Sequence, residues 1–459
     1  MSPPKKTGPQ ARRLSVLDAV AMVLGLVIGS GIFGLPSLVA ANSPGPVSLL
    51  ALWVAGGAVS LMGALCYAEL ASAYPDKGGD YHFLRRAYGP EIGFLFVWGR
   101  MTVIQTGAIA AAAFIAGNYL TEVHRIGEHS AAIYAGLIVA ALTLLNLGGL
   151  QAAKWTQNLL VGVITLGLLA VTVAGFWLGL TGAPLEVTVA VETAPGDAPA
   201  VFGKVGLALV FVLFTYGGWN EAAYLSAEIR NPRRNISKVF LLGIGMVTTI
   251  YLLVNSALLA GLGREGMAGS QAVAADLVRL VWGEPGALFI GVLVVIAVLS
   301  TVNATIITGG RSNYALGRDY PRVFGFLGKW NGRQDIPVAA LILQGGITLA
   351  LIVLAPRVFE EGGLEAMVAY TAPVFWFFFF LAGMSVVVLR WWDPERDRPF
   401  RVPLYPLVPF IFCGVCLYML YSAVAYAGAG SLVGVAVVLA GIPFLVINRF
   451  RESPQDPPL

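Results

Sequence analysis

An apolar run that begins near Leu17 is interrupted at its centre by small residues, and this interruption limits how the chain can fold. The stretch reads GLVIGSGIFGL from Gly25 to Leu35, with Gly29, Ser30 and Gly31 in the middle. A run of this length predicts one membrane-crossing helix, but glycine and serine weaken a helix at that point. Free backbone N–H and C=O groups within a bilayer must be buried in protein or line a watery cavity. The stretch therefore predicts a broken helix with a binding site at its break.

The chemistry of such a break favours a negatively charged ligand. The start of a half-helix presents unpaired N–H groups and the positive end of the helix dipole. These groups suit a carboxylate or another anion. The same glycine pattern is also typical of a small-residue surface on which two membrane helices pack, and this stretch alone does not decide between the two interpretations.

The composition places the chain in a membrane. Hydrophobic residues make up 57% of it and charged residues only 12%, with a mean hydropathy of +0.78. Soluble proteins are about one quarter charged. The net charge of +4 is modest, and no basic block contains interleaved aromatic residues, so nucleic acid is not an expected partner.

The cysteines and the N-terminal segment give no sign of a disulfide framework, a metal site or a signal peptide. Cys66, Cys413 and Cys416 all lie in apolar segments, which argues against a disulfide framework. The last two form a CxxC, but the chain has three histidines and no second pair, so we expect no metal and no cofactor. Residues 1–13 are basic and proline-rich, and we expect a cytoplasmic tail there rather than a signal peptide.

Long apolar segments recur along the whole chain. Because one crossing needs about 20 apolar residues, the sequence predicts an all-α integral membrane protein with twelve transmembrane helices. The fourth segment is short, and it is the one that could be merged or split. The predicted segments are 17–41, 47–74, 92–120, 131–148, 158–181, 204–227, 237–263, 286–309, 337–355, 364–389, 404–427 and 430–448.

The distribution of basic residues orients these segments. With the N-terminus inside, most of the 29 lysines and arginines fall on the cytoplasmic side. Both termini are therefore expected in the cytoplasm of a multi-pass protein of the plasma or inner membrane. Arg100 lies within the third segment near its inner end. The outer side receives Arg125, Lys204, Arg264, Arg279 and Arg357.

The sixth segment repeats the interruption of the first. It reads LVFVLFTYGGWNEAAYLSAEI and is broken by Gly217, Gly218 and Asn220. Two interrupted helices, each the first of its half, are typical of an inverted-repeat transporter. We see no strong residue-level similarity between the halves. The predicted parts are a cytoplasmic tail (1–13), a first five-helix repeat (14–181), an extracellular connector (182–203), a second five-helix repeat (204–390), helices 11 and 12 with their preceding loop (391–448) and a cytoplasmic C-terminal tail (449–459).

The two breaks together predict the class of ligand. If the first offers N–H donors to a carboxylate, the second can offer freed C=O groups to an ammonium group. That pairing describes an α-amino acid. Phe214, Tyr216 and Trp219 stand beside the second break, where they either close over a substrate or pack against neighbouring helices.

The inner loop after the second segment has a pattern of its own. Tyr81, Phe83, Leu84 and Tyr88 surround a pair of arginines in DKGGDYHFLRRAYGPEIG. The spacing suits an amphipathic helix lying along the inner membrane surface. An ordinary solvated loop fits the composition equally well.

Four motifs give the chain a family resemblance. They are GSGIFGLP in the first segment, YAELASAYPDKGGDYHFL after it, FTYGGWN followed by AEIRNPRRNI, and STVNATIITGGRSNYALGRD in the eighth segment. At these residues the sequence resembles the amino acid/polyamine/organocation (APC) transporter superfamily, and most of all its L-type amino acid transporter branch. The resemblance implies a leucine-transporter-like 5+5 inverted repeat with broken first and sixth helices, and an amino acid transporter rather than an enzyme.

The resemblance also implies a substrate site. The backbone around Ile28, Gly29, Ser30, Gly31 and Ile32 would bind the carboxylate, and the backbone around Phe214, Tyr216 and Gly217 would bind the amine. Phe214 matches the aromatic gate of the family. Trp219 and Asn220 match positions that line its cavity.

Departures from the family pattern concern ion coupling. Many relatives carry a lysine in the fifth helix, where this chain has Ile164 or Thr165. Proton coupling through that lysine therefore does not carry over. Glu221 is unusual for the L-type branch, and a carboxylate near mid-membrane is costly and usually functional or paired. It either carries a proton or holds a cation such as Arg100 or the substrate.

Two further expectations follow. Ser300, Thr301 and Thr305 could supply oxygen ligands to sodium, although hydroxyls in membrane helices commonly bond to their own backbone. The loop TEVHRIGEHS has no cysteine, and the animal relatives use a cysteine there to attach a heavy chain, so no disulfide-linked partner is expected.

The sequence as a whole predicts a transporter of neutral L-amino acids that works by exchange or facilitated flux. The alternative within transport is proton- or sodium-coupled uptake, including that of cationic amino acids. The alternative of another class is a non-transporting amino acid sensor. A membrane enzyme is disfavoured because it should show catalytic residues clustered near one face.

Overall fold

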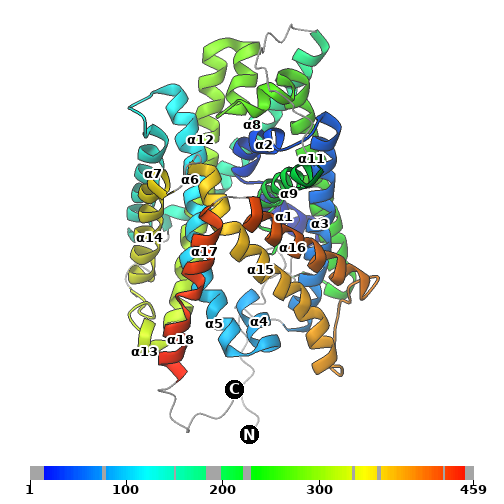
Figure 1. The fold of residues 1–459 in the computed structure, drawn as a ribbon, viewed down its shortest axis with the longest axis vertical. Coiled ribbons are helices and arrows are strands. Elements are labelled where there is room, and N and C mark those ends of the chain that lie inside the picture. Colours follow the sequence, from blue (N-terminus) through cyan, green and yellow to red (C-terminus); the bar gives the residue numbers. More distant parts are fainter. Residues whose placement is uncertain are drawn as a thin grey trace.

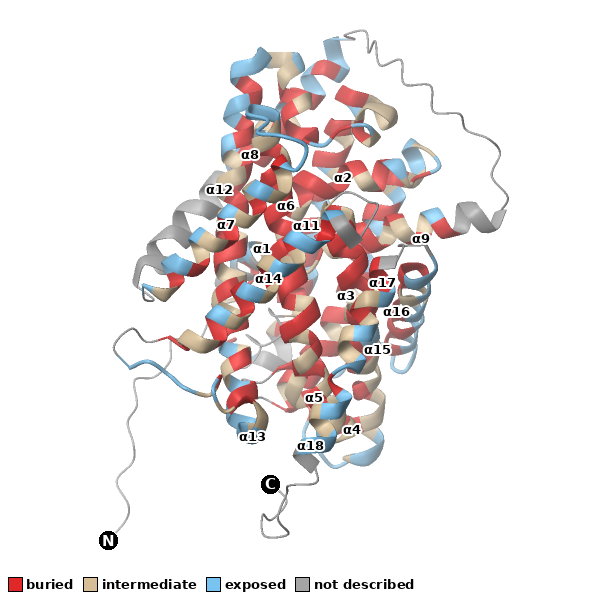
Figure 2. Cartoon of the chain, turned by 60° about the vertical axis from the view of Figure 1, so that its left-hand side comes forward, coloured by how far each residue is buried: buried red, intermediate tan, exposed pale blue. Residues whose placement is uncertain are grey.

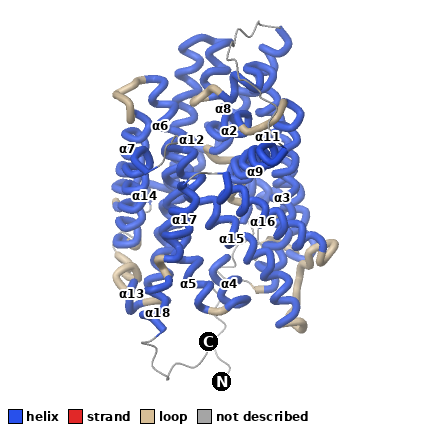
Figure 3. Tube along the Cα trace, viewed as in Figure 1, coloured by secondary structure: helices blue, strands red, loops and turns tan. Residues whose placement is uncertain are grey.

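The computed structural model describes residues 15–74, 79–148, 151–181, 198–220, 229–332, 336–358, 363–426 and 429–449. In this part of the chain the regular structure is helical, with loops between the helices (Figure 3), and an isolated β-bridge pairs Asn331 with Ile336. The expectation of an all-α protein is confirmed for these residues.

The first part of the chain forms a run of helices joined by short turns. A five-residue π-helical turn, η1 (Arg100–Ile104), joins α5 to α6. A π-helical turn inside a longer helix is frequent at functional sites. The helices are α1 (Val16–Val27), α2 (Gly31–Ala41), α3 (Pro46–Ala73), α4 (Asp80–Tyr88), α5 (Pro90–Gly99), α6 (Gln105–Val123), α7 (Ser130–Leu147) and α8 (Gln151–Thr181).

The second part contains the longest helices. Two of them bend at glycines with positive φ, α11 at Gly263 (φ 67°) and α12 at Gly283 (φ 65°). The helices are α9 (Ala198–Thr215), α11 (Pro232–Ala268), α12 (Val273–Asp319), α13 (Pro321–Phe324), α14 (Val338–Val358), α15 (Gly363–Trp392), α16 (Leu407–Tyr426), α17 (Ala429–Leu439) and α18 (Ile442–Arg449).

Both predicted helix interruptions are confirmed. The first separates α1, which ends at Val27, from α2, which begins at Gly31. The second follows Thr215, where α9 ends and residues 216–218 form a turn. Gly218 has φ +107°, a conformation that glycine adopts without a steric penalty. We call these two segments, 28–30 and 216–218, the first break and the second break.

The helix boundaries can be compared with the predicted segments. The fourth and fifth segments are separate helices, α7 and α8. The eighth was expected at 286–309; α12 runs from Val273 to Asp319 with a kink at Gly283, close to the expected start, so the prediction falls short mainly at the C-terminal end. Hydropathy detects only the apolar core of a helix, whereas GRSNYALGRD continues the helix with polar residues. The inner loop forms the helix α4, so a helix is confirmed there.

The exterior of the molecule is apolar. Among the described residues, nine helices are long and apolar enough to cross a membrane. Their outer faces carry exposed side chains such as Leu137, Leu144, Val292 and Leu417, while inward faces are buried (Figure 2). A soluble protein rarely exposes apolar surface on this scale. The structure is that of a multi-pass membrane protein.

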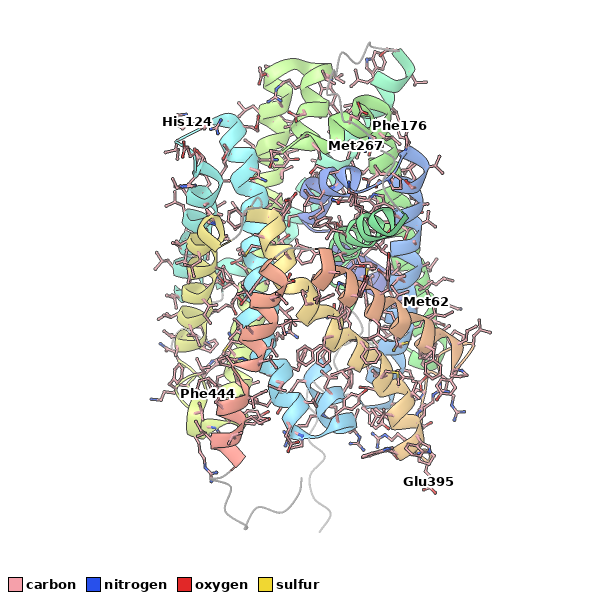
Figure 4. The ribbon with its side chains drawn as sticks, in the orientation of Figure 1. Met62, His124, Phe176, Met267, Glu395 and Phe444 are labelled. Atoms are coloured by element: carbon pink, nitrogen blue, oxygen red, sulfur yellow. The ribbon has the colours of Figure 1, made fainter. Side chains whose placement is uncertain are left out.

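The packing brings both interrupted helices to the middle of the bundle (Figure 1). α2 packs against α9 and α11, and α8 packs against both α11 and α12. Small residues allow these close approaches, since a Cβ added to Gly175 of α8 would lie only 2.2 Å from the backbone oxygen of Ala257. We call the end that carries His124 and Met267 the upper end, and the end that carries Phe444 and Glu395 the lower end (Figure 4).

Candidate functional site

A cavity of about 240 Å³ lies between the two breaks. It is smaller than a typical site for a drug-sized ligand. The lining extends from the breaks down to α4 and α5 at the lower end (Figure 1). The lining residues are Val27, Gly29, Ser30, Gly31, Asp80, Phe96, Arg100, Ile104, Gln105, Ala108, Ala112, Ile115, Phe214, Thr215, Gly217, Gly218, Asn220, Thr301, Thr305, Thr371, Phe375, Phe378 and Phe379.

The first break presents the start of α2 to this cavity. Gly29, Ser30 and Gly31 all line it, and the side chain of the N-cap residue Ser30 makes no capping hydrogen bond to α2. A Cβ added to Gly29 would lie 3.7 Å from Oγ1 of Thr301, whereas one added to Gly31 would lie 3.3 Å from Cα of Thr215. The small residues therefore keep the cavity open at Gly29 and bring the two breaks together at Gly31. Uncapped N–H groups at a helix start can bind an anion.

The second break faces the first. Phe214, Gly217, Gly218 and Asn220 line the cavity. The N–H of Gly217 donates to the carbonyl oxygen of Phe214 at 3.1 Å, which closes a tight turn. A backbone oxygen has two lone pairs, so carbonyls in such a turn can still accept from a ligand.

One tyrosine joins the two breaks. The hydroxyl of Tyr251, on α11, lies 3.0 Å from the carbonyl oxygen of Val27 and 3.1 Å from that of Thr215. These are the last residues of α1 and α9, and Tyr251 is fully buried. Its single proton is shared between two helix ends whose carbonyls have lost their helical partners. Tyr251 therefore fixes the positions of both breaks relative to α11.

Removing this hydroxyl should displace both breaks. Tyr251→Phe leaves the two buried carbonyls without their donor, an effect of about 1–3 kcal/mol. We expect about tenfold weaker amino acid binding, measured by titrating the purified protein. In the control Tyr134→Phe, the lost hydroxyl donates to the carbonyl oxygen of His124 in an exposed loop, and affinity should not change. Equal affinities in all three proteins would contradict this role.

Aromatic residues of α15 form part of the opposite wall. Phe375, Phe378 and Phe379 line the cavity, and the rings of Phe375 and Phe379 lie 4.0 Å apart between centroids. Trp219 packs behind them, with its ring 5.2 Å from that of Phe379 and 5.2 Å from that of Tyr67. These aromatic rings make this part of the wall apolar.

The sequence-predicted residues divide into three groups. Those that line the cavity are Gly29, Ser30, Gly31, Phe214, Gly217, Asn220, Thr301 and Thr305. Glu221 lies outside the described residues. Those that lie elsewhere are Ile28, Ile32, Tyr216, Trp219 and Ser300; for example, Tyr216 is buried and its hydroxyl donates to the carbonyl oxygen of Trp53 at 2.9 Å.

Sequence reasoning missed several lining residues. Gln105 is an uncharged polar side chain at the start of the largely apolar run QTGAIAAAAFIAG, which is a signal that could have singled it out. Asp80 and Arg100 bring opposite charges to the lower part of the cavity. The phenylalanines of α15 belong to the run FWFFFF, where sequence alone does not separate lining from packing.

The described residues provide few candidate ligands for a metal ion. Across the described ranges, no three His, Cys, Asp or Glu side chains form a group that could hold a metal ion. Cys66, Cys413 and Cys416 are buried as free thiols.

Comparison with known proteins places the chain in a family. Residues 14–447 match the family model described as amino acid permease. The chain is 28% identical over 444 residues to the b(0,+)-type amino acid transporter 1 of Mus musculus, with 96% of this chain and 88% of the relative covered. It is 27% identical to the Asc-type amino acid transporter 1 of Mus musculus (96% and 82% covered) and 25% identical to the cystine/glutamate transporter of Homo sapiens (94% and 84% covered). Since the family model spans nearly the whole chain, the protein belongs to the amino acid permease family.

Proposed function

We propose that the protein transports neutral L-amino acids across the plasma or inner membrane by alternating access, through exchange or facilitated flux. The observation that carries this proposal is the single cavity that both breaks line. It supports a carboxylate on the N–H groups at the start of α2 and an ammonium group on carbonyls of the second break. The relatives named above are amino acid transporters, which supports the same substrate class.

The proposed architecture has twelve transmembrane helices in a leucine-transporter-like 5+5 inverted repeat. The two interrupted helices and the nine membrane-length helices of the described residues support it. In this arrangement both termini are cytoplasmic, and the lower end faces the cytoplasm. Glu395 lies at the lower end (Figure 4), and Arg390, Arg396, Arg398 and Arg401 are its near neighbours in the sequence, which supports that orientation.

In this orientation the cavity would face inward. Its lining reaches Asp80 of α4 at the lower end. Toward the upper end, the hydroxyl of Tyr119 donates to the carbonyl oxygen of Phe33 at 2.9 Å and accepts from the N–H of Ala274 at 3.2 Å. These contacts tie α2, α6 and α12 together above the site. The proposed state is therefore closed outside and accessible from the cytoplasm.

Ion coupling is the alternative within transport. Thr301 and Thr305 line the cavity, but their hydroxyls donate to the carbonyl oxygens of Ala297 and Thr301. Each oxygen retains a lone pair, so neither is prevented from binding a cation. The loop at 121–130 contains no cysteine, and we propose that the protein works without a disulfide-linked heavy chain.

Uptake into proteoliposomes tests the proposal. Radiolabelled neutral, cationic and acidic amino acids are offered with and without internal amino acid, and with imposed sodium or proton gradients. We expect internal amino acid alone to stimulate uptake of neutral substrates severalfold. Dependence on an ion gradient would favour coupled uptake, and binding without flux would favour a sensor.

A further inference from the structure

The side-chain amide of Gln105 is fixed by the backbone of a neighbouring helix. Its Nε2 donates to the carbonyl oxygen of Thr305 at 2.9 Å and to Oγ1 of Thr308 at 3.1 Å. The Thr308 hydroxyl itself donates to the Thr305 carbonyl oxygen at 3.2 Å. A flipped amide would put Oε1 against that carbonyl oxygen, and two acceptors cannot bond. Both amide hydrogens of Gln105 are therefore used, and its remaining hydrogen-bonding capacity is the acceptor Oε1.

Gln105 lines the proposed substrate cavity. The residue is 6% exposed, and the α6 residues that share this wall are the apolar Ala108, Ala112 and Ile115. An acceptor in such surroundings loses free energy if it finds no donor. A donor on a bound molecule can meet this acceptor.

The threonines that line the cavity together with Gln105 also offer acceptors rather than donors. Each hydroxyl donates within its own helix, as Thr215 does to the carbonyl oxygen of Phe211 at 2.9 Å and Thr371 to that of Met367 at 2.9 Å. Thr301 and Thr305 do the same on α12. Their oxygens can still accept but have no proton to give. The wall formed by α6, α12 and α15 thus offers acceptors, and the charges of Asp80 and Arg100 lie toward the lower part of the cavity.

We propose that Gln105 selects substrates whose side chains carry a hydrogen-bond donor, such as the hydroxyl amino acids, over apolar side chains of the same shape. This inference rests on the proposed function and names the substrate class of that site. With the carboxylate and ammonium groups on the two breaks, the substrate side chain extends toward the opposite wall of α6, α12 and α15. A site built to bond a substrate hydroxyl rejects the analogue that lacks it.

Threonine and valine form the matched pair that tests this inference, because they have nearly the same shape. We expect the wild-type protein to prefer threonine by about tenfold or more in kcat/KM. Gln105→Met keeps the length of the side chain and removes its polar atoms, so the ratio should fall to near one, mainly through lost threonine transport. The control Thr121→Val changes a threonine on the same helix that bonds to Gly117, and the ratio should persist.

The outcomes separate the two proposals. A wild-type ratio near one, or an unchanged ratio in Gln105→Met with alanine transport intact, would overturn the role of Gln105 while leaving amino acid transport in place. If the wild-type protein transports no amino acid at all, the proposed function itself fails. If Gln105→Met does not fold, the wild-type protein still tests the inference. Threonine should then raise its melting temperature more than valine does, and equal stabilisation by the two would contradict the inference.

Discussion

Leucine at Gly29 is expected to abolish amino acid binding and transport, whereas leucine at Gly25 should leave both unchanged. The two glycines lie four residues apart in one stretch but face different surroundings. A Cβ at Gly29 would point toward Thr301 across the cavity, at 3.7 Å from its Oγ1. The rest of a leucine side chain would then fill the space a substrate needs. At Gly25, which is exposed, an added Cβ meets nothing within 4 Å.

The expected loss at Gly29 is large. We expect affinity to fall by at least about 100-fold, which corresponds to about 2.8 kcal/mol. Leucine also favours helix where glycine does not, so it should stabilise a continuous helix and remove the free N–H groups of the break. The measurement is substrate binding to purified protein that elutes as a single species. Retained affinity in Gly29→Leu would exclude the first break from the site, and a similar loss in Gly25→Leu would show that the effect is not local.

The breaks were predictable because their cause is local. Glycine and serine in the middle of an apolar run weaken a helix wherever the run lies in the fold, and both interruptions occur where the sequence indicated. The same pattern predicted that Gly29, Ser30 and Gly31 of the first break line the cavity. Phe214 and Asn220 also lie on the cavity, because they are adjacent to the second break.

The rest of the site depends on contacts between distant segments. Tyr251 reaches the ends of α1 and α9 from a third helix, and its partner Val27 is 224 positions away. Gln105 is oriented by α12, which is 200 positions away. Nothing near either residue in the sequence indicates these partners. For Trp219 the local sequence was a poor guide. Its position beside the glycines suggested that it lines the cavity, whereas in the fold its ring packs against those of Tyr67 and Phe379.

Glu69 lies at the centre of a cluster of charged side chains. It lies near the end of α3 and is 2% exposed. Arg390 of α15 donates to both carboxylate oxygens, from Nε at 2.7 Å and from Nη2 at 2.6 Å. The N–H of Val402 donates to Oε2 at 2.6 Å, and Arg398 lies 3.6 Å from Oε1. One carboxylate therefore joins α3, α15 and the loop that follows α15.

Glu69→Ala is expected to destabilise the protein by about 3–5 kcal/mol, because it leaves the buried Arg398 and the partly buried Arg390 without their counter-charge. The measurement is the free energy of unfolding, or the melting temperature, of the protein in detergent. A matched control is Glu284→Ala, whose carboxylate pairs with Arg279 at 2.8 Å but is 79% exposed. That pair should contribute no more than about 1 kcal/mol.

A double-variant cycle separates the ion pair from simple loss of packing. Arg390→Ala also breaks the bidentate contact and removes a guanidinium that stacks 3.8 Å above the ring of Tyr405. Because the two single changes remove one shared interaction, Glu69→Ala with Arg390→Ala should cost less than the sum of the two. Partners in direct contact typically differ from additivity by about 0.5–3 kcal/mol. Additive losses would mean that Glu69 acts through Val402 and Arg398 instead, and that the loop rather than α15 is what the carboxylate holds to α3.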